Sequence, residues 1–184
     1  RSTGLRSPFM DDLAATVQRL ADTQAIADVV GARYAKALDW LDLPRLKQCF
    51  WEDGHVDYGF FVGNAHEWCD IVMPIEASSL HRFHYVFNIL VDLDGDKATV
   101  ESNSLAGSRR VGGGDEPVMQ SLHGSRYLDT AERRGDEWRI LERTVLLEFT
   151  NRYPSPDAPH GAISALQLVS GLDPDDPRYR PYDL

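Results

Sequence analysis

The stretch HYVFNILVDLDGDKATVESNSLAGSR, residues 84–109, decides the fold class of this chain. From His84 to Asp92 side chains alternate between two faces with a period of two, which is the period of a β-strand. Asp94-Gly95-Asp96 is typical of a tight turn, and a second strand-like run follows from Lys97 to Arg109. The stretch therefore predicts an antiparallel hairpin.

The strand-like pattern continues downstream. Residues 118–131 and 137–150 predict two more strands, joined by a turn around Arg134-Gly135-Asp136. Consecutive strands with short connections pair as antiparallel neighbours, so the second half of the chain is expected to form an antiparallel meander.

The first half of the chain has a helical period instead. Apolar residues spaced by three and four predict helices at Asp11–Leu20, Asp22–Leu41 and residues 65–78. Asp42 followed by Leu43-Pro44 is typical of a helix start, and this helix should run through Phe50. A short strand is expected at Val56–Phe60. Helices followed by a meander favour an α+β fold.

Composition narrows the class of protein. With 184 residues, of which 42% are hydrophobic, the chain fits one domain with a buried core. The formal charge of −10 repels phosphate backbones, so nucleic acid is not an expected partner. No apolar run reaches a membrane-spanning length of about 18 residues. Two cysteines, Cys49 and Cys69, make no disulfide framework, and a reducing cytoplasm is the simplest location.

Both ends of the chain are expected to lie outside the domain. Residues 1–9 resemble an expression tag, with Met10 as the expected native start. The domain is expected to cover residues 10–152. Residues 153–184 contain six of the ten prolines and the apolar stretch Ile163–Val169, so we expect a tail that packs over a pocket or on a neighbouring subunit.

His84 shares a strand face with Val86 and Asn88. Both faces of this strand are largely apolar, which predicts that it is covered on both sides. A buried His and Asn need hydrogen-bond partners. His84 is therefore either a core histidine bonded to a carbonyl or a catalytic base.

Two further strands place polar groups in apolar surroundings. Arg143 lies in a row with Val145 and Leu147, and because it stays charged it needs a carboxylate or an anionic ligand. Alternatively, Arg143 is an edge residue whose head reaches water. In the preceding strand His123 and Tyr127 share a face, which either lines a pocket or faces solvent.

Asp39 raises a conflict within the helix that carries it. It lies 13 residues after Ile26, which is about 220° around an ideal helix and far from the apolar stripe. An uninterrupted helix would therefore turn Asp39 to solvent. It could face inward only if the helix breaks or a cavity lies beyond its end.

Several short strings, taken in order, resemble the SnoaL-like families of the nuclear transport factor 2-like superfamily. They are Tyr34-Ala-Lys-Ala-Leu-Asp39, Phe50-Trp-Glu-Asp53, His84-Tyr-x-x-Asn88 and Trp138-Arg-Ile140-x-x-Arg143. The likeness covers roughly residues 11–150. It is closest to the group that contains gamma-hexachlorocyclohexane dehydrochlorinase, scytalone dehydratase and bile acid 7α-dehydratase.

This resemblance implies a cone-shaped α+β barrel, in which a curved, mainly antiparallel sheet and N-terminal helices surround an apolar pocket. By position, Asp39 and His84 match the catalytic dyad of the group, with Asp39 at the cone mouth. Tyr34 matches the tyrosine of the dehydratase members and Arg143 a pocket arginine. The chain departs from the group in two respects, since His123 matches a second active-site histidine only loosely and no pocket aspartate is matched.

The implied function is a cofactor-independent lyase, a dehydratase, acting on a small hydrophobic cyclic substrate. The alternatives are an isomerase or polyketide cyclase, a non-catalytic binding protein, and the small structural subunit of a ring dioxygenase. No metal motif such as HExxH is present. A homo-oligomer, trimer or dimer, is expected. Beyond the four catalytic candidates, the expected substrate-binding residues are Asn88, His123, Tyr127, Trp40, Phe60, Trp68, Val86, Val145 and Leu147.

Overall fold

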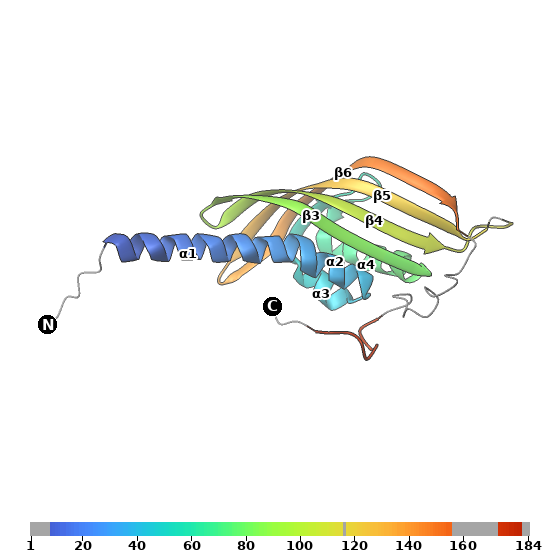
Figure 1. Ribbon diagram of the computed structural model, residues 1–184, viewed down its shortest axis with the longest axis horizontal. Coiled ribbons are helices and arrows are strands. Elements are labelled where there is room, and N and C mark those ends of the chain that lie inside the picture. Colours follow the sequence, from blue (N-terminus) through green and yellow to red (C-terminus); the bar gives the residue numbers. More distant parts are fainter. Residues whose placement is uncertain (1–7, 116, 156–172, 182–184) are drawn as a thin grey trace, which may run out of the picture.

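The computed structural model describes residues 8–115, 117–155 and 173–181. Its N-terminal part is one helical run with three segments: α1 (Pro8–Ala27), the π-helix η1 (Asp28–Arg33) and α2 (Tyr34–Asp39) (Figure 1). The two helices expected here are therefore joined. The run begins at Pro8, inside the segment expected to be a tag, so residues 8 and 9 take part in the fold.

Two shorter helices follow, and side-chain caps fix their starts. In α3 (Leu43–Gln48) the Asp42 carboxylate accepts a hydrogen bond from the backbone N–H of Arg45. In α4 (Ala65–Ala77) the Asn64 side chain accepts from two backbone N–H groups of the first turn. Such caps satisfy N–H groups that have no partner inside the helix. Both helices begin where the sequence predicts them, but α3 ends at Gln48, and Phe50, expected to be its last residue, begins a strand.

The sheet has six strands in the order β2-β1-β6-β5-β4-β3. All neighbours are antiparallel except β1 and β6, which are parallel, so the sheet is mixed and open. It arches over the helices α2 to α4 (Figure 1). The expected α+β class with a curved sheet against N-terminal helices is confirmed. The strands are β1 (Phe50–Asp57), β2 (Val62–Asn64), β3 (His81–Asp94), β4 (Lys97–Arg110), β5 (Met119–Arg134) and β6 (Glu137–Pro154).

The first strand lies further upstream than expected. The sequence predicts Val56–Phe60, but β1 ends at Asp57, and Gly59, at φ 75°, lies in the loop that follows it. β6 continues to Pro154, two residues beyond the expected domain boundary.

A bulge in β3 changes which residues face the helices. Asn88 has φ 52°, and the pairing with β4 shifts between Phe87 and Leu90. His84 and Val86 face inward before the bulge, whereas Ile89 packs against the core after it. An extra residue reverses the alternation in this way because the side-chain period of a strand is two.

The outer face of β3 is open to solvent within the described residues. Tyr85, Phe87 and Leu90 are 59%, 44% and 70% exposed. The expectation that both faces of this strand are covered was therefore wrong. The core lies on the other face, between the sheet and the helices, and includes Val30, Trp68 and Ile140.

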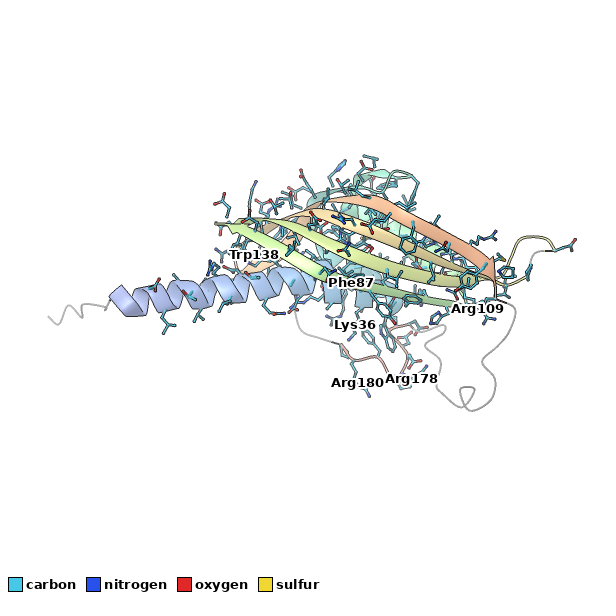
Figure 2. All side chains as sticks on the ribbon, turned by 45° about the horizontal axis from the view of Figure 1, so that its top comes forward. Lys36, Phe87, Arg109, Trp138, Arg178 and Arg180 are labelled. Carbon is cyan, nitrogen blue, oxygen red and sulfur yellow. The ribbon has the colours of Figure 1, made fainter. Side chains whose placement is uncertain are left out.

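The described part of the C-terminal tail packs on its own subunit. The Tyr179 hydroxyl donates to Asp42 Oδ2 at 2.5 Å, and its ring contacts Trp40 with centroids 5.2 Å apart. Lys36 Nζ donates to the Arg180 carbonyl, and Figure 2 shows Lys36 above this segment. The apolar stretch Ile163–Val169 lies outside the described residues. Among the helices of the described ranges, none combines the length and apolar character needed to cross a bilayer.

Candidate active site

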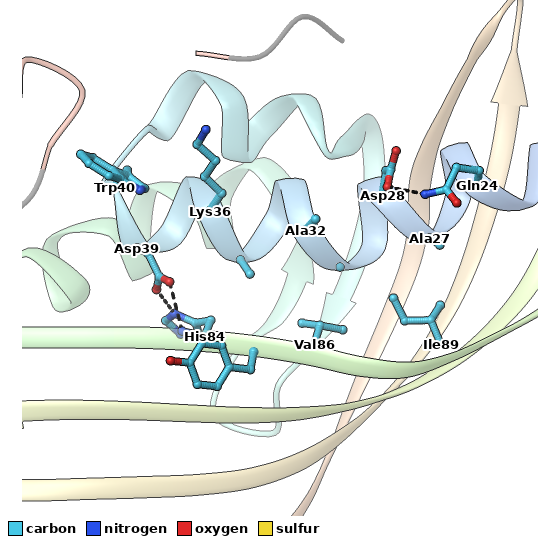
Figure 3. A pocket seen from close by; sticks show the side chains of 13 residues that line it. Gln24, Ala27, Asp28, Ala32, Lys36, Asp39, Trp40, His84, Val86 and Ile89 are labelled. Atoms are coloured by element: carbon cyan, nitrogen blue, oxygen red, sulfur yellow. Dashed lines mark hydrogen bonds and ion pairs between the residues drawn. The ribbon is translucent and has the colours of Figure 1, made fainter. Parts of the chain in front are cut away.

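Asp39 and His84 form a hydrogen-bonded pair between the end of α2 and strand β3. His84 Nδ1 lies 2.8 Å from Asp39 Oδ1, and the His84 backbone N–H donates to Asp39 Oδ2 at 3.3 Å (Figure 3). The side chains are only 11% and 20% exposed. Because a carboxylate only accepts hydrogen bonds, it favours the tautomer with hydrogen on Nδ1. The neutral ring then presents Nε2 as a base.

The π-helix explains why Asp39 faces His84. An ideal α-helix advances about 100° per residue and would turn Asp39 away from the sheet. In η1 the hydrogen bonds span five residues, so each residue advances by less. Residues spaced by four consequently stay on one side of the run. Ala27, Gly31, Ala35 and Asp39 all line a groove against β3.

A cavity of about 390 Å³ lies on the other side of His84, between the sheet and the helices. Its walls are mainly apolar and aromatic, as is usual for small-molecule sites. The expected site residues that line it are Tyr34, Phe60, Trp68, His84, His123, Tyr127, Val145 and Leu147. Leu38, Tyr58, Val72, Glu76, Ala106 and Ser125 complete the lining.

Two tyrosine hydroxyls meet at the cavity wall. The hydroxyl oxygens of Tyr34 and Tyr58 are 2.8 Å apart, and the Trp68 ring stacks on Tyr58 with centroids 4.3 Å apart. Burial raises the pKa of both phenols above the ordinary value. Both therefore stay neutral and can donate hydrogen bonds. Tyr58 was not among the predicted site residues; its signals in the sequence were its place in a strand-like run and in the string Val56-Asp-Tyr58, which resembles the SnoaL-like families.

His123 and Glu76 contribute polar groups to the cavity. His123 Nδ1 contacts the Thr150 hydroxyl at 2.9 Å. Burial and Arg110 lower its pKa, which Glu76 partly offsets, so the ring is neutral near pH 7. The sequence analysis did not select Glu76 because a single acid near a helix end looks like an ordinary surface residue.

Arg143 lies behind the cavity wall. Its side chain is fully buried and forms a two-point ion pair with Asp129, at 2.8 Å from Nε and 2.7 Å from Nη2. The guanidinium carbon lies 4.2 Å from the ring centroid of Tyr34 and 4.3 Å from that of Tyr127. Burial alone would lower the pKa of Arg143, but Asp129 holds it well above the ordinary value.

These contacts correct two expectations about Arg143. Its head does not reach water, so it is not an edge arginine. Its carboxylate partner is Asp129. The Tyr34 and Tyr127 rings, which line the cavity, pack against the guanidinium, and Arg143 itself is not among the lining residues, so it is not a pocket arginine.

Three expected substrate-binding residues lie outside the cavity. Trp40 and Val86 line the open groove of about 550 Å³ between the helical run and β3 (Figure 3). Asn88 is exposed at the β3 bulge, where its amide lies 3.5 Å from Asn103 Oδ1. The bulge places Asn88 on the exposed side of β3, whereas Trp40, just after the end of α2, and Val86 face the groove instead of the cavity. Nowhere in the described ranges do three His, Cys, Asp or Glu side chains gather as a metal site would require.

Comparison with known proteins identifies the family. Residues 18–144 match the SnoaL-like domain, and the chain belongs to this family. No curated protein sequence matches it.

Solved structures show the same nuclear transport factor 2-like fold. A hexachlorocyclohexane dehydrochlorinase of type 2 superposes with a TM-score of 0.69 at 20% identity, covering 79% of this chain and 99% of that one. A scytalone dehydratase-like protein of Novosphingobium aromaticivorans gives 0.65 at 22% identity, covering 78% and 99%. A protein of the same organism, described as nuclear transport factor 2-like with a cystatin-like fold, gives 0.61 at 23% identity, covering 79% and 92%.

Proposed function

We propose that this protein is a cofactor-independent lyase that removes water from a small cyclic hydroxy-ketone. The observation that carries the proposal is His84, which lines an apolar cavity together with the Tyr34–Tyr58 hydroxyl pair and is hydrogen-bonded to Asp39 on the groove side. A positioned base and a hydrogen-bond donor facing one apolar space are the two groups that an elimination needs.

His84 is the base in this mechanism. Its Nε2 takes a proton from the carbon beside the substrate carbonyl, and the released electron pair forms the new double bond. Asp39 holds the ring in the required tautomer and stabilises the imidazolium that forms. No metal or organic cofactor is required for these steps.

The tyrosine pair assists the leaving group. As the carbon–oxygen bond breaks, the hydroxyl leaves with its bonding electrons and needs a proton to become water. Of two hydroxyls 2.8 Å apart, one donates to the other, and the second hydrogen can point to the substrate. The raised pKa of Tyr34 and Tyr58 keeps both protonated for this role. His84 then releases its proton to solvent, and the tyrosine that gave its proton to the leaving group takes one back from solvent.

The size of the cavity favours a small substrate. Its 390 Å³ falls at the lower end of ordinary ligand pockets, which span about 300–1,000 Å³. Trp68, Val145 and Leu147 offer apolar contact to a ring of the substrate. His123 and Ser125 can hydrogen-bond a second oxygen of the substrate.

Mass spectrometry tests the proposal. The protein is incubated with a panel of cyclic β-hydroxy-ketones, and each mixture is searched for a product lighter by one water. We expect such a product with wild type and only background conversion with His84→Ala. An isomerase or cyclase would give a product of unchanged mass, and a binding protein would give none while still shifting the melting temperature.

A further inference from the structure

Arg143 makes one contact that neither its ion pair nor the cavity explains. Its Nη2 donates a hydrogen bond to the backbone carbonyl of Val30 at 3.1 Å. Val30 lies inside the π-helix η1 and is fully buried. Therefore a charged donor from strand β6 binds the helical run at its irregular segment.

The contact extends to the next segment of the run. Tyr34 is the first residue of α2, and the Arg143 guanidinium carbon lies over its ring, 4.2 Å from the centroid. Arg143 thus holds the run on both sides of the transition from π to α geometry. Asp129, directly opposite Arg143 in the β5–β6 register, fixes the guanidinium from the sheet side.

The transition matters because it sets the direction of Asp39. Asp39 ends α2, five residues after Tyr34, and meets His84 only because the π turn slows the rotation of the run. If η1 relaxed to an α-helix, Asp39 would rotate about the helix axis relative to Val30, and its carboxylate would move away from His84. π turns are rare and occur mostly as single turns inside α-helices, so the groups that bind this one from outside bear on whether it keeps its geometry.

We propose that Arg143 is a positioning residue for the Asp39–His84 pair, acting through the Val30 carbonyl and the Tyr34 ring. The inference rests on the proposed function for its catalytic meaning, but its structural part stands on these contacts alone. In this proposal Arg143 acts on the geometry of the helical run and does not contact the substrate.

Arg143→Lys is the sharpest variant. Lysine keeps a positive charge beside Asp129, but a single ammonium group cannot replace the planar fork that binds Asp129 and Val30 together. Asp129→Leu combined with Arg143→Met is the second variant, since it removes both charges and leaves no buried charge unpaired. Arg139→Lys is the matched control, because Arg139 lies on the same strand but packs on Trp51.

The readout is the tautomer of His84, measured by NMR of protein with ¹⁵N-labelled histidine rings and assigned with His84→Gln. Wild type and Arg139→Lys should show hydrogen on Nδ1. Arg143→Lys and the double variant should fold and show mixed tautomers. On a substrate found by the water-loss assay, turnover should fall about 10- to 100-fold with KM unchanged.

Two results would overturn the inference. One is a folded Arg143→Lys and a folded double variant that both keep the wild-type His84 signals. The other is that neither variant folds, which would make Arg143 a residue of general stability. If the tautomer changes as expected but His84→Ala turns over substrate at the wild-type rate, the positioning role stands and the proposed function fails.

Discussion

At the residue scale, the proposed mechanism requires that the Asp39 carboxylate orient His84 and balance the charge that His84 gains. Asp39→Asn keeps the size of the side chain but removes its charge, so the His84 ring loses both its tautomer preference and the stabilisation of the imidazolium. Because a positioned base contributes about 10²–10⁴-fold, we expect turnover to fall at least about 100-fold. Steady-state kinetics on a hydroxy-ketone substrate found by the water-loss assay measures this, with circular dichroism as the check on folding. Full activity in Asp39→Asn would contradict the dyad.

The buried ion pair of Asp129 and Arg143 makes a second prediction at this scale. Asp129→Ala leaves the Arg143 guanidinium fully buried without a counter-charge. Removing one partner of a buried pair costs about 3–5 kcal/mol, and replacing both with apolar residues costs much less. Urea unfolding should therefore show a larger loss for Asp129→Ala than for Asp129→Leu with Arg143→Met. Equal losses of unfolding free energy in the two variants would mean that the unpaired Arg143 charge is not what destabilises Asp129→Ala.

At the element scale, the π-helix packs tightly against β3 through Gly31. A Cβ at this position would lie 2.8 Å from Ile89 Cδ1. Gly31→Val therefore overpacks the contact and should lower the free energy of unfolding by about 1–3 kcal/mol. Ile89→Ala in the same chain should recover part of this loss, so that the double variant is less destabilised than the sum. Gly113→Val is the control, since nothing lies within 4 Å of its Cβ position. Additive losses would mean that the two side chains do not meet.

The elements also show where sequence reasoning reaches its limit. The hairpin around Asp94-Gly95-Asp96 and the helix start at Asp42 were predictable because turn and cap residues act locally. The inward direction of Asp39 was not, because it depends on a π turn supported by Arg143 from a distant strand. An ideal helical wheel drawn from the local sequence therefore placed Asp39 on the wrong face of the helix, and only the family resemblance predicted that Asp39 faces inward.

The register between strands was likewise not predictable from the local sequence. The partner of Arg143 was unpredictable because Asp129 faces it only after a register shift at Thr130. In β3 the bulge at Asn88 likewise moved this residue out of the predicted site. Bulges depend on pairing with a neighbouring strand, which a single-strand pattern does not contain.

At the scale of the whole molecule, two partly buried histidines couple folding to pH. Burial lowers the pKa of His81 and of His123 below the ordinary value. The unfolded chain then binds more protons as pH falls below about 6.5, so stability decreases in that range. Urea midpoints measured from about pH 8 to about pH 5 should fall less steeply for His123→Gln than for wild type. Parallel curves would show that His123 has the same pKa in both states.

The exposed apolar surface of the molecule favours a homo-oligomer. In Figure 1 the helix α1 projects beyond the sheet, and its Leu13, Val17 and Leu20 are 47%, 56% and 62% exposed. With the open outer face of β3, this leaves more apolar surface than single scattered side chains would give. A projecting helix also gains little stability without packing partners. We therefore expect α1 to pack on a second copy of the chain.

Charged substitutions test this assembly. Val17→Lys with Leu20→Lys should reduce the mass measured by light scattering from that of a trimer or dimer to that of a monomer, and should lower the melting temperature. Leu90→Lys tests whether the outer face of β3 contributes to the contact between subunits. Val111→Lys is the control, since this residue is 69% exposed in a loop and should leave the mass unchanged. A monomeric wild type would contradict the prediction, and an unchanged mass in the α1 variant would place the contact elsewhere on the surface.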